Sequence, residues 1–269
     1  LKYAGRTPSA RDTIFNTGAP PLIAHGEELK RSVSHWRNLG IEEGRFVFSF
    51  IGSMSRSRPL ESIITAFQSL PHDMSALLVL AGEGDLKAKY QSLAVGNPRI
   101  LFPGWLGAVD IAALGSLSNV MLAPYRPGLS FSMPTKLFDY MAAGRPILSS
   151  CTGEAEEVML RHRLGHSYKF DSPSDAAKKM RWFFEHQLEA EEMGRRAKAL
   201  FDSKYSSSQI AKNARANSGS SMLPIATPSR KNRAPRPGSC TPVSSVPAFT
   251  SGNSFFIASS QRARSSSLP

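Results

Sequence analysis

Long apolar runs and cysteine are both scarce in this 269-residue sequence. It contains no apolar run of the roughly 20 residues that a membrane-spanning helix needs, so we expect no such helix. No signal peptide opens the chain, which begins at Leu1 without a start methionine, as a fragment would. Its two cysteines, Cys151 and Cys240, are too few for a disulfide framework and do not decide the redox compartment.

Acidic residues are absent from residues 213–269, which hold seven of the 33 Lys and Arg residues. The formal net charge of +12 therefore falls to +5 over residues 1–212, where 26 basic residues stand against 21 acidic ones. Such a charge favours anionic ligands or membrane surfaces only weakly. Residues 213–269 are rich in Ser, Pro and Arg with little periodicity, which predicts a disordered tail. A natural tail and a shifted reading frame both explain this abrupt change in composition.

Residues 45–212 alternate apolar segments with amphipathic ones, whereas residues 1–44 hold an irregular start and a helix over 27–39. Strands are predicted at 46–51, 76–81, 99–102, 120–123 and 147–149. Helices are predicted at 59–70, 85–94, 110–117, 134–143, 154–162, 174–186 and 189–202. This alternation predicts an α/β fold in which a doubly wound, Rossmann-like parallel sheet has helices on both faces.

Ligands of such sheets bind at the carboxyl ends of the strands, so the loops that follow strands are the candidate sites. The first of these begins at Gly52 and leads into a helix predicted to start at Pro59. A helix start favours phosphate through its free N–H groups, and Arg56 and Arg58 add two cations there. Phosphate binding and two solvated arginines are equally good interpretations of this loop alone.

Two further loops follow strands and carry weaker signals. Gly82-Glu-Gly84 permits a tight turn with close approach to a ligand, although an ordinary strand-to-helix turn is the commoner outcome for this motif alone. In Pro103-Gly104-Trp105, the indole of Trp105 would border a nucleobase or pack in the core, and packing is the commoner outcome.

The loop over 124–134 leads into a helix that carries Lys136 and Asp139. Asp139 lies more than one turn inside this helix, so it is not a capping residue. Its carboxylate is either solvated or, beside apolar neighbours at the strand ends, accepts hydrogen bonds from a ribose. Together the loops indicate a nucleotide or phosphate ligand without defining the reaction.

Four segments occur in an order that resembles a known family. They are Phe48-Ser-Phe-Ile-Gly-Ser-Met54, Leu78-Val-Leu-Ala-Gly-Glu-Gly84, Ile100-Leu-Phe-Pro-Gly104 and Pro134-Thr-Lys-Leu-Phe-Asp-Tyr-Met-Ala-Ala-Gly-Arg-Pro146. Roughly residues 40–212 are similar to the C-terminal domain of group-1, family-4-type glycosyltransferases. These enzymes have two facing Rossmann-like domains, the arrangement called GT-B. The last segment looks most like enzymes of capsule, O-antigen or exopolysaccharide assembly.

The resemblance implies a nucleotide-diphosphate sugar as donor, with the binding residues Gly52, Arg56, Arg58, Gly104, Trp105, Ser132, Met133, Lys136 and Asp139. Arg58 matches the family's phosphate-binding lysine and Asp139 its ribose-binding glutamate, and these two are the predicted catalytic residues. The arginine that usually follows the strand-end glycine falls on Ser53. The family's sugar-contacting glutamate falls on Phe131 and is absent.

Backbone N–H groups around Ser130, Ser132 and Met133 would meet the diphosphate. The resemblance also implies retention of configuration, with no cofactor and no bound metal. The family's first domain, which holds the acceptor, is missing, so we expect a separate acceptor-binding domain or chain. The acceptor would be a glycan or a lipid-linked glycan.

The expected location is cytoplasmic or peripheral at the inner face of the membrane. A non-catalytic nucleotide-sugar-binding module or an inactive fragment is the alternative. A nucleic-acid-binding protein ranks third, prompted by the pI of about 10.0 and the Arg-rich tail, and no specific nucleic-acid partner is predicted.

Overall fold

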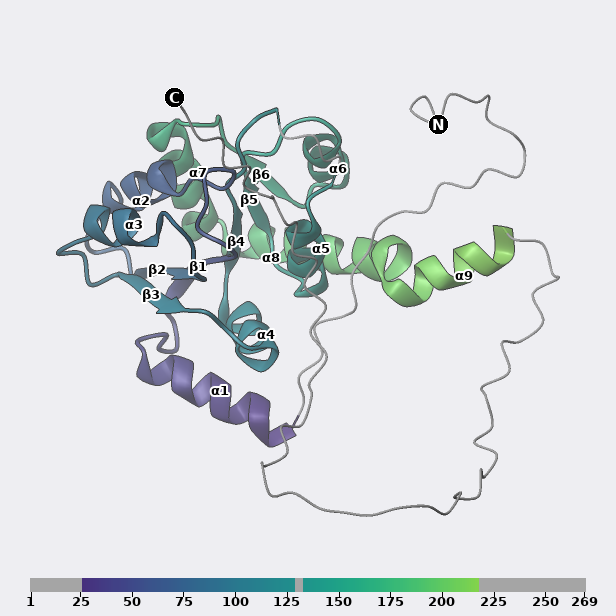
Figure 1. Cartoon of the computed structure of the whole chain (residues 1–269), viewed down its shortest axis with the longest axis horizontal. Helices are drawn as coiled ribbons and strands as arrows, with labels where there is room; N and C mark the ends of the chain where they lie inside the picture. The colour runs from purple at the N-terminus through teal and green to yellow at the C-terminus, as the bar shows by residue number, and fades with distance from the viewer. Residues whose placement is uncertain (1–25, 129–132, 218–269) are drawn as a thin grey trace, which may run out of the picture. The chain divides into compact units, whose positions relative to one another are not determined.

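The computed structural model describes residues 26–128 and 133–217. Within them, parallel strands form one sheet in the order β3-β2-β1-β4-β5-β6 (Figure 1). The strands are β1 Phe46–Ile51, β2 Ala76–Ala81, β3 Ile100–Gly104, β4 Val120–Ala123, β5 Ile147–Ser149 and β6 Gly165–Ser167. The chain adds β2 and β3 on one side of β1 and then β4, β5 and β6 on the other. This is the predicted doubly wound, Rossmann-like sheet, and its strand order reverses between β1 and β4.

Helices cover both faces of the sheet (Figure 1). They are α1 Gly26–Asn38, α2 Glu61–Gln68, α3 Lys87–Leu93, α4 Ala108–Leu117, α5 Thr135–Ala142, α6 Glu154–His162, α7 Pro173–Glu185, α8 Gln187–Leu200 and α9 Ser207–Asn217. On one face α2 packs against α3 and α7, and on the other α1 packs against α4. None of the helices in residues 26–128 and 133–217 is long and apolar enough to cross a bilayer.

The central strands are apolar along their length because both of their faces are buried. Side chains alternate between the two layers, as the two-residue period of a strand requires. Val47 and Ile51 of β1 face the layer of α1, α4 and α5, whereas Phe46, Phe48 and Phe50 face that of α2, α3 and α7. Each large apolar side chain buried in this way stabilises the fold by about 1.5–3 kcal/mol.

The predicted strands 46–51, 76–81, 120–123 and 147–149 are confirmed with the same bounds. β6 was missed, because Gly165-His-Ser167 is short and has no apolar run. The start of the first helix after β1 was also wrong, since α2 begins at Glu61 and not at Pro59. The Leu60 N–H instead donates to the Tyr90 hydroxyl at 3.3 Å, which holds the chain in a turn before the helix.

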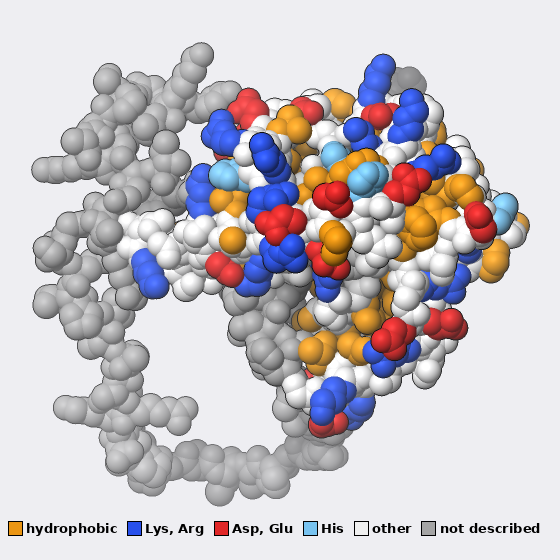
Figure 2. Space-filling model, turned by 180° about the vertical axis from the view of Figure 1, so that it is seen from behind, with side chains coloured by type: hydrophobic (Ala, Val, Ile, Leu, Met, Phe, Trp, Pro, Cys, Tyr) orange, Lys and Arg blue, Asp and Glu red, His pale blue; other side chains and the backbone are white. Residues whose placement is uncertain are grey.

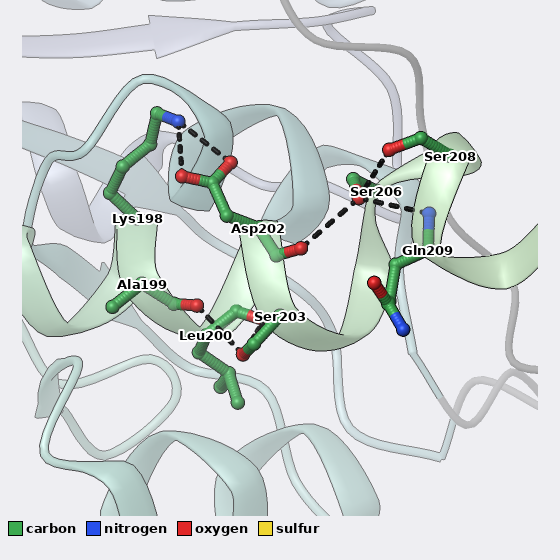
Figure 3. A network of polar contacts seen from close by, with 8 residues as sticks. All are labelled: Lys198, Ala199, Leu200, Asp202, Ser203, Ser206, Ser208 and Gln209. Atoms are coloured by element: carbon green, nitrogen blue, oxygen red, sulfur yellow. Dashed lines mark hydrogen bonds and ion pairs between the residues drawn. The ribbon is translucent and has the colours of Figure 1, made fainter. Parts of the chain in front are cut away.

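A π-helical segment, Phe201–Tyr205, joins α8 to α9 (Figure 3). Lys198 Nζ donates to both carboxylate oxygens of Asp202, at 2.7 and 2.6 Å, and Ser206 Oγ donates to the Asp202 carbonyl at 3.2 Å. Ser206 Oγ also accepts from the Gln209 N–H at 3.3 Å and so caps α9. α9 crosses the predicted domain boundary at 212, so residues 213–217 are helical rather than tail. The rest of the predicted tail and residues 1–25 lie outside the described residues.

Charges of both signs share the surface of the described residues. Figure 2 shows Lys and Arg side chains interspersed with Asp and Glu on the face drawn there. Exposed ion pairs within helices also combine both signs of charge. Lys30 Nζ lies 2.8 Å from Glu27, and Arg195 Nη2 lies 2.7 Å from Glu192. The mixture agrees with the small net charge of residues 1–212.

Candidate active site at the reversal of strand order

The sheet opens at its carboxyl edge between β1 and β4. β1 pairs with β2 over its whole length, from Phe46 to Ile51. In its pairing with β4, Phe48 lies opposite Val120 and Ser49 lies opposite Met121. This pairing ends two residues before the end of β1. The position where strand order reverses is the usual ligand crevice of such sheets.

The Tyr140 hydroxyl of α5 meets the unpaired end of β1. It accepts from the Ile51 N–H at 3.3 Å and donates to the Ile51 carbonyl at 3.4 Å. Both residues are buried, with exposed fractions of 2% for Tyr140 and 6% for Ile51. A side chain of α5 therefore occupies the place beside Ile51 where the pairing with β4 has ended.

Two glycines allow the loop after β2 to lie against the loop after β1. A Cβ atom at Gly82 would lie 1.9 Å from the Gly52 carbonyl oxygen, and one at Gly84 would lie 2.4 Å from the Met54 carbonyl oxygen. Both glycines have positive φ, 133° and 150°. Their main role in the structure is this close packing, which holds Gly52 and the residues after it at the edge of the crevice.

Arg58 connects the loop after β1 with Tyr125, two residues after β4. Its Nη2 donates to Ser53 Oγ, and it is hydrogen-bonded to the side chain of Tyr125. Its Nε is buried without a hydrogen-bond partner among the described residues. A partly buried guanidinium with an unsatisfied donor is suited to bind phosphate.

Arg126 joins the same two loops through backbone carbonyls. Its N–H donates to the Ser57 carbonyl at 3.1 Å and its Nε to the Arg56 carbonyl at 3.2 Å. Its guanidinium carbon lies 5.7 Å from the centroid of the Phe170 ring, beyond β6. Arg56 thus contributes its backbone to this joint, while its side chain is exposed. The predicted role of that side chain in phosphate binding stays a prediction.

Asp139 and Lys136 lie one turn apart on α5 and form an ion pair, with 3.2 Å between Lys136 Nζ and Asp139 Oδ2. The two side chains are 26% and 27% exposed respectively. They line a small gap together with Tyr140. Both side chains are therefore partly exposed to solvent.

The charges of Arg58 and Asp139 both act on the hydroxyls of Tyr125 and Tyr140. Burial is the largest cause that raises the pKa of Tyr125 to about 12, and burial also raises the pKa of Tyr140. At both tyrosines the Arg58 charge opposes this increase and the Asp139 charge adds to it. Both hydroxyls therefore stay protonated at neutral pH. The structure thus gathers the two predicted catalytic residues around one pair of tyrosines.

The other predicted binding residues are more dispersed. Gly104 ends β3, and its carbonyl accepts from the Gly82 N–H at 2.7 Å. Trp105 is 71% exposed, so it does not pack in the core, and β2 separates its strand from β1. Met133 packs partly buried against the layer that contains α5. Residues 129–132 of the loop before α5, which include Ser130, Phe131 and Ser132, lie outside the described residues.

Sequence reasoning missed Tyr125 and Tyr140, although both stand in segments that it singled out. Tyr125 follows β4 by two residues, at the edge where ligands bind. Tyr140 lies beside Asp139, and its place on the apolar face of a helix indicated packing alone. A hydroxyl on a buried helix face needs a polar partner, and this requirement was the available signal.

No group of three or more His, Cys, Asp or Glu side chains placed to hold a metal occurs among residues 26–128 and 133–217. The prediction of a metal-free site stays a prediction.

Known proteins resemble the chain in sequence and in fold. The D-rhamnosyltransferase WbpZ of Pseudomonas aeruginosa is 30% identical over 172 residues, which are 63% of this chain and 43% of that protein. The chain thus spans less than half the length of this relative. HepE from Anabaena, solved in complex with UDP and glucose, has a TM-score of 0.62 at 16% identity, covering 77% of this chain and 56% of that one.

The C-terminal domain of LpcC, a glycosyl transferase group 1 family protein from Francisella tularensis, has a TM-score of 0.56 at 16% identity. The similarity covers 69% of this chain and 97% of that domain. These structures share the fold of the chain. The profile of the family described as glycosyl transferases group 1 matches residues 45–186, more than half of the sequence. The chain therefore belongs to the group 1 glycosyl transferases.

Proposed function

We propose that this chain is the donor-binding half of a glycosyltransferase that uses a nucleotide-diphosphate sugar. The observation that carries the proposal is the cluster at the reversal of strand order. There Arg58 supplies a cation and Asp139 a carboxylate around two buried tyrosine hydroxyls. Family membership favours the same reaction, and the solved HepE complex contains UDP and glucose.

In the proposed complex, Arg58 and the start of α5 bind the diphosphate. The N-cap residue of α5 is Pro134, whose side chain makes no cap hydrogen bond to the N–H groups that begin the helix. Asp139 accepts hydrogen bonds from the ribose hydroxyls. The cationic groups stabilise the charge that develops on the departing nucleotide diphosphate. The sugar passes through an oxocarbenium-like state, and the reaction proceeds with retention and without a metal or cofactor.

The proposed acceptor is a glycan or a lipid-linked glycan of the cell surface, on the cytoplasmic side of the membrane. The relation to a D-rhamnosyltransferase supports a polysaccharide role. The acceptor would be held by a domain or chain outside the present sequence, which spans 43% of WbpZ. Alone, the chain should bind donor and transfer its sugar poorly.

A non-catalytic nucleotide-sugar-binding module is the second candidate. Phe131 stands where the family often has a sugar-contacting glutamate, and this observation favours binding without transfer. The two candidates differ when an acceptor-binding half from a relative is added. A catalytic half then produces transfer, whereas a binding module does not.

Calorimetry of the full chain against UDP-, GDP- and ADP-glucose tests the proposal. We expect one of the three to bind with clear preference, because a folded nucleotide site distinguishes bases. Absence of binding by all three at millimolar concentration would exclude both candidates.

A further inference from the structure

We propose that Tyr140 is a positioning residue of the donor site, whose hydroxyl joins the helix that carries Asp139 to the strand that leads to Arg58. The inference rests on the function proposed above. It is drawn from the hydrogen bonds at the open end of the sheet, which tie Tyr140 to the backbone of Ile51.

The Ile51 backbone needs a partner on its β4 side. Asn119 N–H donates to the Val47 carbonyl at 2.8 Å, and β1 and β4 pair at Ser49, so alternate residues of β1 point toward β4. Ile51 is the next in this series, and its N–H and C=O point the same way. The β4 pairing has ended there, and Tyr140 supplies both an acceptor and a donor in its place.

The other side of the opening is held differently. Ser150 Oγ accepts from the Tyr125 N–H at 3.0 Å and donates to the Tyr125 carbonyl at 2.9 Å. This hydroxyl therefore ties the segment after β4 to the segment after β5. With β4 held toward β5, the join between β1 and α5 depends on Tyr140.

Loss of the hydroxyl would leave two buried backbone groups without a partner. Ile51 is 6% exposed and Tyr140 is 2% exposed, so water has little access to replace the bonds. The turn of α5 at Tyr140 would then be free to shift against β1. Asp139 directly precedes Tyr140 on that turn, and Gly52 begins the loop toward Arg58. Their separation sets the fit of a ligand that bridges them.

Tyr140→Phe tests the inference because it removes the hydroxyl and keeps the ring. We expect the full chain to bind the preferred one of UDP-, GDP- and ADP-glucose about three- to tenfold more weakly, because part of the net free energy of the two lost hydrogen bonds is lost from donor binding. The matched control is Tyr90→Phe. Tyr90 is fully buried and its hydroxyl accepts from the Leu60 N–H at 3.3 Å, the same distance as in the Tyr140 contact. This control should bind donor within twofold of wild type.

A double-mutant cycle with Asp139→Asn separates positioning from general loss of stability. If Tyr140 acts through Asp139, Tyr140→Phe should lose most of its effect in the Asp139→Asn background. An equal loss in both backgrounds, or an equal loss in Tyr90→Phe, would overturn the inference. Normal donor binding by Tyr140→Phe would also overturn it and leave the proposed function standing. If the wild-type chain binds none of the three nucleotide sugars, the proposed function itself fails.

A measurement on the wild-type chain keeps the test independent of whether the variant folds. Bound donor should slow hydrogen exchange at the Ile51 amide more than at the Leu60 amide, because the ligand would tighten the join between β1 and α5. Equal slowing at both amides would contradict a special role for Tyr140.

Discussion

At the scale of single residues, Arg58 is the cation that the structure ties to both loops of the crevice. Arg58→Ala should weaken donor binding by roughly 10- to 100-fold, because charge-assisted hydrogen bonds contribute about 1.5–3 kcal/mol. Arg58→Lys keeps the charge but loses the planar fork, so its affinity should lie in between. Calorimetry with the preferred nucleotide sugar measures both.

Arg56→Ala tests the other arginine that was predicted to bind the donor, whose side chain is exposed. Its donor affinity should change by no more than about threefold, in line with a solvated charge. Equal losses at the two arginines would show that the loop acts through its overall charge. The specific role of Arg58 would then be wrong.

His166 makes stability depend on pH. Its ring lies edge-on to Trp182, with centroids 4.3 Å apart, and its Nε2 is buried without a partner among the described residues. Burial first, and then the charges of Lys179 and His186, lower the pKa of His166. The folded protein therefore holds this proton more weakly than the unfolded chain does. The contribution of neutral His166 is present above the ordinary pKa of about 6.5 and is lost as pH falls below it.

Urea unfolding between about pH 8 and pH 5 measures this contribution. His166→Gln should reduce the fall in the free energy of unfolding toward acid pH. If the free energy of unfolding of His166→Gln depends on pH as that of the wild type does, groups other than His166 cause the pH dependence.

At the scale of elements, Gly194 allows α8 to lie against the end of α5. A Cβ atom at Gly194 would lie 2.3 Å from the Gly144 carbonyl oxygen. Gly194→Ala should therefore lower the free energy of unfolding by about 1–3 kcal/mol. This sign is opposite to the gain of about 1 kcal/mol that helix propensity alone gives for Gly→Ala.

Gly115, inside α4, is the matched control for this change. Its nearest heavy atom to an added Cβ is 3.4 Å away, an ordinary contact. Gly115→Ala should be neutral or stabilising in the same urea titration. If the free energy of unfolding rises in both variants, α8 moves away from the end of α5 at little cost in free energy.

Element by element, the strands were the most predictable part of the chain. Buried strands of a parallel sheet are apolar at every position, and such runs are visible in sequence, as in 46–51 and 76–81. β6 has no such run because it is short and two of its three residues, His166 and Ser167, are partly exposed. Its place is fixed by pairing with β5, which local sequence does not reveal.

The site was predictable in part for a related reason. Residues directly after strands share one edge, so position made Arg56 and Arg58 candidates. Resemblance to the family then singled out Arg58 and Asp139. The role of Tyr140 depends on where the pairing between β1 and β4 ends. That end point results from packing of the whole sheet, which a single sequence does not display.

At the scale of the whole molecule, basic charge concentrates in the tail rather than in the described residues. The visible face in Figure 2 mixes both signs, and residues 213–269 contain no acidic residue. A chain that ends at Asn217 should keep its donor affinity within twofold. Any salt-sensitive binding of the full chain to random DNA should disappear from it, because phosphate contacts require the cationic segment. DNA binding retained without the tail would revive the nucleic-acid hypothesis.

The exposure of Trp105 gives the carboxyl edge of the sheet its own optical signal. The chain has three tryptophans, and the other two are shielded: Trp36 is 1% exposed, and Trp182 stacks on His186 with ring centroids 4.6 Å apart. Red-shifted tryptophan fluorescence should therefore come mainly from Trp105. Acrylamide should quench mainly the fluorescence of this residue. A ligand or partner domain that covers this edge would shift that emission to the blue, so its arrival is visible without any label.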